Sequence, residues 1–105
     1  MNKNKEILNK VEKLVEESKY TEAIDLLTNE LEKEEKVDLY MKRGDLYTKT
    51  RKYGRALGDY RKVVKLDKDN VAAKTKIQFT ENILSIENTF YYENPYTDDK
   101  LIPEL

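Results

Sequence analysis

An internal period of 33 residues constrains the fold of this 105-residue chain more than any other feature. The segment Tyr20-Thr21-Glu22-Ala23-Ile24 returns 33 residues later as Tyr53-Gly54-Arg55-Ala56-Leu57, with its aromatic, small and aliphatic positions kept. Periods of about 20 to 50 residues are typical of stacked supersecondary units, each of which buries one face against its neighbours. The period therefore predicts a stacked array, and it favours a binding surface over an active site.

Apolar residues recur at helical spacing in five stretches that short polar turns separate. We expect helices over residues 4–17, after Thr21, over 37–49, over 54–66, and over 71–86 or slightly beyond. Thr21 and Asn70 are candidate N-caps of the second and fifth helices. Because the turns are short, neighbouring helices should run antiparallel. The prediction is an all-α antiparallel helix-turn-helix array in a domain over residues 1–87, followed by a C-terminal tail over 88–105.

Small and aromatic residues in the middle of the chain predict how two of these helices pack. Gly44 lies inside the third helix, where glycine costs about 1 kcal/mol relative to alanine. Close approach of a neighbouring helix would offset that cost, and Ala56, near the start of the fourth helix, is the expected partner. Tyrosine rings would fill the surrounding space, since each buries a large apolar area. The predicted packing residues are Tyr40, Gly44, Tyr47, Tyr53, Ala56 and Tyr60.

These positions resemble the tetratricopeptide repeat. The family pattern runs from a large residue through Gly, Tyr, an aromatic at the turn, Ala and an aromatic to a closing Leu-Asp. Residues 37–70 match it at Tyr40, Gly44, Tyr47, Tyr53, Ala56, Tyr60 and Leu66-Asp67. They depart from it at Arg43, Val63 and Lys68, where leucine, alanine and proline are usual. Residues 4–36 resemble a more divergent repeat and residues 71–86 the first helix of a third, which implies an α-solenoid of about two and a half repeats.

The resemblance implies a non-enzymatic module that binds a protein or peptide. Tetratricopeptide arrays bind extended peptides or helices in a concave groove lined by the first helix of each repeat. Core burial is the competing explanation for the apolar residues among the matching positions. The candidate groove residues are Leu8, Glu12, Val15, Asp38, Met41, Asp45, Lys49, Thr75, Phe79, Asn82 and Ile83.

One specialisation within the family can be compared directly with this chain. Repeats that clamp the C-terminal carboxylate of heat-shock chaperones share a set of lysine, asparagine and arginine residues at fixed groove positions. The matching positions here hold Leu8, Glu12, Lys42, Ala72 and Lys76. The asparagines are absent and an acid replaces one of them, so a chaperone clamp is not expected.

Composition excludes most catalytic chemistry. The chain has no cysteine and no histidine, which removes thiolate nucleophiles and the commonest general base and zinc ligand. It also lacks a glycine-rich phosphate loop and a complete calcium loop. We expect neither a metal site nor a cofactor. The charged N-terminus and the absence of a long apolar run predict a cytoplasmic protein that does not enter a membrane.

Charge is distributed unevenly along the chain. Residues 1–36 and 71–105 each carry a balance of −3, whereas residues 37–70 carry +5. The basic middle could attract an acidic partner or be neutralised within the molecule. Nucleic-acid binding is not expected, because the sequence pI is about 5.6 and the nearby tyrosines are better explained as core.

Residues 88–105 combine aromatic and apolar side chains with acids. Disordered tails are usually poor in aromatic residues, and the fifth helix, which lacks a pairing helix, should leave an apolar flank around Ile77 and Leu84. Three interpretations stay open: the tail caps this flank, lies in a groove of its own or a neighbouring copy, or is free. The second gives an alternative function, a self-associating structural protein joined through residues 88–105 as a homo-oligomer.

Overall fold

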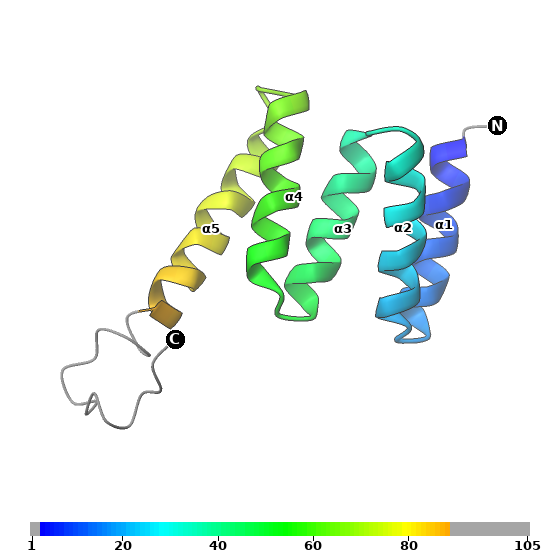
Figure 1. The fold of residues 1–105 in the computed structure, drawn as a ribbon, viewed down its shortest axis with the longest axis horizontal. Coiled ribbons are helices and arrows are strands. Elements are labelled where there is room, and N and C mark those ends of the chain that lie inside the picture. The colour runs from blue at the N-terminus through cyan, green and yellow to red at the C-terminus, as the bar shows by residue number, and fades with distance from the viewer. Residues whose placement is uncertain (1–2, 89–105) are drawn as a thin grey trace.

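A computed structural model describes residues 3–88 and shows five helices in one all-α array (Figure 1). The helices are α1 (Lys3–Glu16), α2 (Tyr20–Lys33), α3 (Val37–Lys49), α4 (Tyr53–Leu66) and α5 (Val71–Asn88). Each helix packs against the next one along the chain, and neighbours run antiparallel. The predicted fold class is confirmed. Apart from Asn88, the predicted tail lies outside the described residues.

The helix bounds differ little from the predicted ones. The third helix has the predicted range, and α5 ends two residues beyond position 86. Asn70 caps α5 as expected, because its Oδ1 accepts a hydrogen bond from the Ala73 N–H at 2.9 Å. The N-cap predicted at Thr21 is wrong. Helix α2 begins at Tyr20, and the residue at its N-cap position, Lys19, forms no side-chain capping bond.

The α1–α2 and α3–α4 turns share one backbone conformation. Ser18 and Arg51, which are 33 residues apart, both have positive φ angles, 60° and 64°. In each turn the next N–H donates to a carbonyl five residues earlier, which is the Schellman ending of an α-helix. The two donor–acceptor pairs are Lys19–Leu14 and Lys52–Tyr47, both at 2.8 Å. The period in the sequence is therefore a period in the backbone as well.

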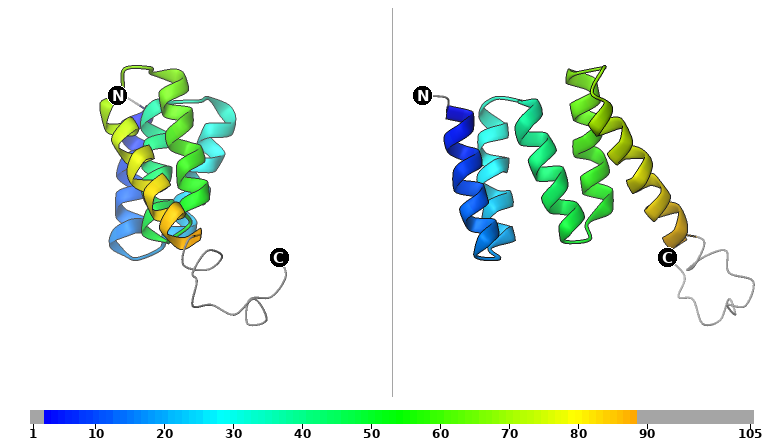
Figure 2. Two further views of the ribbon diagram at one scale, coloured as in Figure 1. Left: turned by 90° about the vertical axis from the view of Figure 1, so that its left-hand side faces the viewer. Right: turned by 180° about the vertical axis from the view of Figure 1, so that it is seen from behind.

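The helices form two layers (Figure 2). Helices α1, α3 and α5 lie on one side, which we call the odd-helix face, and α2 and α4 lie on the other. The main cluster of buried residues between the layers consists of Ile7, Val11, Ala23, Leu27, Leu31, Leu39, Tyr40, Leu46, Val63 and Ala73. A second cluster consists of Tyr47, Ala56 and Tyr60. Helix α5, like α1, contributes two buried residues, which are Ala73 and Thr80.

The packing around Gly44 differs in one respect from the prediction. Tyr40, Gly44, Tyr47, Ala56 and Tyr60 are all buried, and Tyr53 is partly exposed at the start of α4. A Cβ atom added to Gly44 would lie 2.7 Å from Cε1 of Tyr60, and the three nearest atoms all belong to that ring. The closest approach to Gly44 therefore comes from Tyr60 rather than from Ala56.

Candidate functional site

The odd-helix face contains a hollow of about 340 Å³ between α3 and α5. Three of the candidate groove residues, Asp45, Lys49 and Phe79, come together there. The complete lining is Asp45, Thr48, Lys49, Tyr60, Lys76, Phe79 and Thr80. We call this site the α3–α5 hollow.

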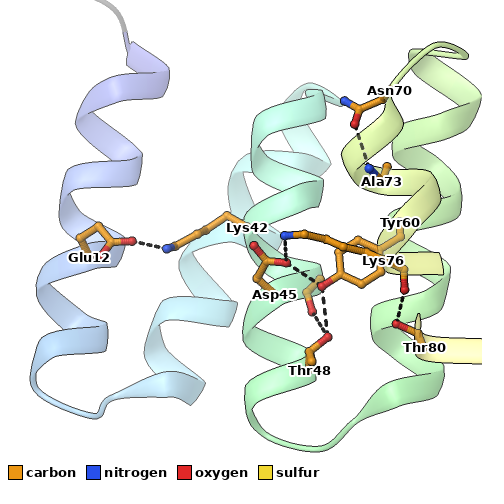
Figure 3. Close-up of polar contacts among 10 residues, drawn as sticks. Glu12, Lys42, Asp45, Thr48, Tyr60, Asn70, Ala73, Lys76 and Thr80 are labelled. Carbon is orange, nitrogen blue, oxygen red and sulfur yellow. Dashed lines mark hydrogen bonds and ion pairs between the residues drawn. The ribbon is translucent and has the colours of Figure 1, made fainter. Parts of the chain in front are cut away.

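Asp45 is the centre of a hydrogen-bonded network that joins three helices (Figure 3). Its Oδ1 accepts hydrogen bonds from the Tyr60 hydroxyl and from Nζ of Lys76, both at 2.6 Å. Oγ1 of Thr48 donates to the Gly44 carbonyl at 3.0 Å and lies 3.1 Å from the Tyr60 hydroxyl oxygen. The Lys76 ammonium also lies 5.7 Å from the centroid of the Tyr60 ring. These contacts hold the ring in place as one wall of the hollow.

Two tyrosines ionise less readily than a tyrosine in water. Burial raises the pKa of Tyr60, and the hydrogen bond that its hydroxyl donates to Asp45 raises it further. Burial likewise raises the pKa of Tyr40, whose hydroxyl donates to Glu35 at 2.9 Å. Both side chains are neutral donors in the folded protein, and each donates to a carboxylate.

We expect the protein to lose stability as the pH rises above about 10, with Tyr60 contributing to the loss. A raised pKa means that the folded state holds the proton more tightly than the unfolded state does. The stabilisation is therefore complete below the ordinary tyrosine pKa of 10.0 and falls as the pH rises beyond it. Urea unfolding at several pH values should show a shallower alkaline loss for Tyr60→Phe than for the wild type. Identical slopes in the two proteins would contradict the assignment.

Two ion pairs of the same kind connect the odd helices (Figure 3). Lys42 of α3 pairs with Glu12 of α1, and Lys76 of α5 pairs with Asp45 of α3. The partners are 30 and 31 residues apart, close to the sequence period. Each lysine thus reaches an acid on the corresponding helix one repeat earlier. The spacing of 30 and 31 residues between acid and lysine is present in the sequence, but the pairing becomes visible only when the helices are packed.

The other candidate groove residues of α1 and α3 do not extend the hollow. Leu8, Val15 and Met41 are partly buried and pack against the core, as the competing explanation requires. Glu12 is occupied by its ion pair with Lys42. Asp38 accepts a hydrogen bond from the Asn4 amide at 3.3 Å.

On α5, the candidates Thr75, Phe79 and Asn82 line a second hollow of about 460 Å³, and Ile83 is partly buried. Phe79 belongs to both hollows and is 59% exposed. It is the only candidate groove residue that lines both, and it therefore borders two distinct surfaces of the last helix.

Lys49 gives the α3–α5 hollow an available positive charge. Its side chain is exposed, and its ammonium lies 5.4 Å from the centroid of the Tyr20 ring. Within residues 3–88 it forms no ion pair with an acidic side chain. An exposed ring at position 79 and this cation can together hold an apolar group and a nearby carboxylate.

The pair of Arg43 and Asp59 is the polar feature that the sequence interpretation missed. Asp59 is 4% exposed, and its two oxygens accept hydrogen bonds from Nε and Nη2 of Arg43 at 2.9 and 2.7 Å. Nη1 donates to Oγ1 of Thr28 at 3.1 Å. The guanidinium carbon lies 5.7 Å from the ring centroids of both Tyr40 and Tyr47. The hydrogen bonds to Asp59 raise the pKa of Arg43. The sequence signal for this pair was arginine at position 43, where the repeat pattern usually has leucine. The side chain of Arg43 joins α2, α3 and α4.

Part of the basic middle segment is neutralised within the molecule. In addition to Lys42 and Arg43, Arg61 pairs with Glu81 at 3.1 Å and Lys62 pairs with Glu35 at 3.3 Å. Hydrogen bonds from Tyr40 and Lys62 lower the pKa of Glu35, so this acid stays charged to lower pH. Of the two interpretations of the basic segment, an acidic partner or neutralisation within the molecule, the latter therefore holds for these four cations.

Three further findings bear on function. Among residues 3–88, no group of three or more histidine, cysteine or acidic side chains lies close enough to hold a metal ion. In the same part of the chain, none of the helices has the length and apolar character needed to cross a membrane. Comparisons of the chain with protein-family models, with curated proteins and with solved structures find no match.

Proposed function

We propose that this protein is a short, non-enzymatic tetratricopeptide array that binds a protein or peptide on its odd-helix face. The observation that carries the proposal is the α3–α5 hollow, where the exposed ring of Phe79 and the available cation Lys49 line one cavity. The family assignment is supported by the equivalent turns at Ser18 and Arg51 and by the close packing of Gly44 on Tyr60. Repeat arrays present such faces as extended binding surfaces.

The proposed ligand is a peptide segment with an apolar or aromatic side chain beside a carboxylate. The apolar group would pack on Phe79, and the carboxylate would pair with Lys49. Asp45 is not available to attract a second cation, because Tyr60 and Lys76 already donate to it. The face thus favours an acidic ligand over a basic one.

This chemistry differs from recognition of a chaperone carboxylate. Lys42 and Lys76 occupy two of the positions that the chaperone-clamping repeats use, and both are paired with acids of the same face. Releasing either lysine would break an ion pair between two helices. We therefore place the ligand's carboxylate at Lys49.

Selection of a random peptide library against the full chain tests the proposal. We expect the selected peptides to combine an apolar residue with a neighbouring acid. Fluorescence polarisation should show that Phe79→Ala and Lys49→Ala each weaken binding by about tenfold or more, which corresponds to about 1.4 kcal/mol. Both side chains are exposed, so neither variant should impair folding.

Lys65→Ala is the matched control, because Lys65 is an exposed lysine on α4, in the opposite layer. Its affinity should equal that of the wild type. Peptides that bind the Phe79→Ala and Lys49→Ala variants as tightly as the wild type would place binding elsewhere. A selection that enriches no peptide would count against a peptide-binding function.

A further inference from the structure

Helix α5 carries an apolar stripe on the side turned away from α4. Val71, Phe79 and Ile86 are 73%, 59% and 69% exposed. At 3.6 residues per turn they lie within about 80° of one another around the helix, roughly opposite the buried Ala73 and Thr80. We call these three residues the outer stripe. The second hollow of α5 lies on it, and no other described helix covers it.

The outer stripe is not the flank that the sequence interpretation expected to be open. Ile77 is partly buried and packs against the cluster of Tyr47, Ala56 and Tyr60, and Leu84 is also partly buried. The exposed apolar residues of α5 are therefore on the opposite side of the helix. Whatever covers the last helix must approach it from the end of the array and not from α4.

We propose that the chain's own residues 89–105 cover the outer stripe, including the side of Phe79 that borders the second hollow, and leave its side in the α3–α5 hollow open to a ligand. This segment follows directly after α5 and contains the apolar and aromatic residues Phe90, Tyr91, Tyr92, Tyr96, Leu101, Ile102 and Leu105. The stripe from Ile86 back to Val71 is about 22 Å long at 1.5 Å per residue. Ten extended residues span about 33 Å, so a chain that reverses after α5 reaches the whole stripe with residues to spare.

The area of the stripe favours this occupant over a second copy of the chain. One face of an 18-residue helix, about 27 Å long and about 10 Å wide, offers roughly 270 Å². A stable interface between separate proteins takes about 800 Å² from each partner. A segment tethered to the same helix needs far less area, because its effective concentration is on the order of millimolar.

Charge agrees with the same arrangement. Residues 89–105 carry four acidic side chains and one basic side chain. Lys74, exposed at the N-terminal end of α5, lines the hollow on the stripe and forms no ion pair within residues 3–88. A segment that returns antiparallel to α5 brings Asp98 and Asp99 toward this lysine, after the aromatic residues have passed Ile86.

Paramagnetic relaxation measured by NMR on the full chain tests this proposal. The chain has no cysteine, so a single introduced cysteine carries the spin label. A label at Thr75→Cys, an exposed position that lines the hollow on the stripe, should remove the peaks of residues 90–96. A label at Glu32→Cys, exposed on α2, should leave those peaks unchanged. Ile86→Ser should restore the peaks lost with the Thr75→Cys label, whereas Leu66→Ser, at the end of α4, should not.

A mixed sample separates the alternatives. Isotope-labelled wild type is combined with unlabelled chain that carries the spin label at Thr75→Cys, so that only contacts between copies remove peaks. Loss of peaks in the mixture would make a second copy the occupant and overturn the proposal. Unchanged peaks of residues 90–96 in both samples would overturn it as well, and leave the stripe open to another partner. Phe79 is unaltered throughout, so the result does not depend on peptide binding in the α3–α5 hollow.

Discussion

Asp59→Ala should lower the free energy of unfolding by about 3 kcal/mol, the largest effect that we expect of any single substitution. The carboxylate is 4% exposed and accepts two hydrogen bonds from Arg43. Its removal leaves a guanidinium whose side chain is 18% exposed, between two tyrosine rings and without its acid. Breaking a buried pair by removing one partner is costly because the remaining charge is desolvated and uncompensated.

The reverse substitution and the double variant show where the cost arises. Arg43→Leu should also destabilise, because it leaves Asp59 buried without a partner. The double variant Arg43→Leu/Asp59→Ala leaves no buried charge, and apolar replacement of a whole ion pair is often close to neutral. We therefore expect the double variant to be clearly more stable than the sum of the two single effects predicts.

Urea unfolding followed by circular dichroism measures all four proteins. Arg61→Ala is the matched control, since its pair with Glu81 is exposed and such pairs contribute about 0 to 1 kcal/mol. Additive single effects would show that Arg43 and Asp59 act independently. A loss below about 1 kcal/mol for Asp59→Ala would show that the pair is no more important than a surface pair.

The sequence predicts the fold well because the fold depends on features that repeat. The 33-residue period fixes the number and order of helices, and the backbone repeats it at Ser18 and Arg51. Asn70 was identifiable as a cap because a side-chain oxygen before a helix has one obvious use. Thr21 also has a side-chain oxygen that could cap a helix. However, the Schellman turn at the end of α1 lets α2 begin at Tyr20, so that Lys19, two residues before Thr21, occupies the N-cap position.

The sequence predicts the candidate site less completely, because the site depends on contacts between repeats. Position within a repeat places Asp45 and Lys49 on one face. It does not show that Lys76 neutralises Asp45, or that Lys49 has no acidic partner within residues 3–88. Leu8 and Val15 are partly buried against the main cluster, and periodicity alone does not separate such positions from open groove positions. Arg43 was visible as a departure from the family pattern, but its partner Asp59 reads as an ordinary surface acid until the helices are packed.

Gly44→Ala should destabilise the protein by about 1 to 3 kcal/mol, although alanine is the better helix former. In an open helix interior the substitution would gain about 1 kcal/mol. At position 44, however, the new methyl group would lie 2.7 Å from Cε1, 3.0 Å from Cδ1 and 3.1 Å from Cζ of Tyr60. The first distance is shorter than carbon atoms tolerate, so either the ring or the helix must move.

The ring of Tyr60 cannot move at low cost, which decides the sign of the effect. It is 2% exposed, and its hydroxyl donates to Asp45 at 2.6 Å, so a shift would break that bond and disturb the wall of the α3–α5 hollow. Gly58→Ala is the matched control: it lies inside α4, nothing lies within 4 Å of the added Cβ, and it should stabilise by up to about 1 kcal/mol. Thermal unfolding should therefore order the proteins as Gly58→Ala above wild type above Gly44→Ala. If Gly44→Ala instead melts at or above the wild-type temperature, the approach of Tyr60 to α3 is looser than these distances indicate, and glycine is not required there for packing.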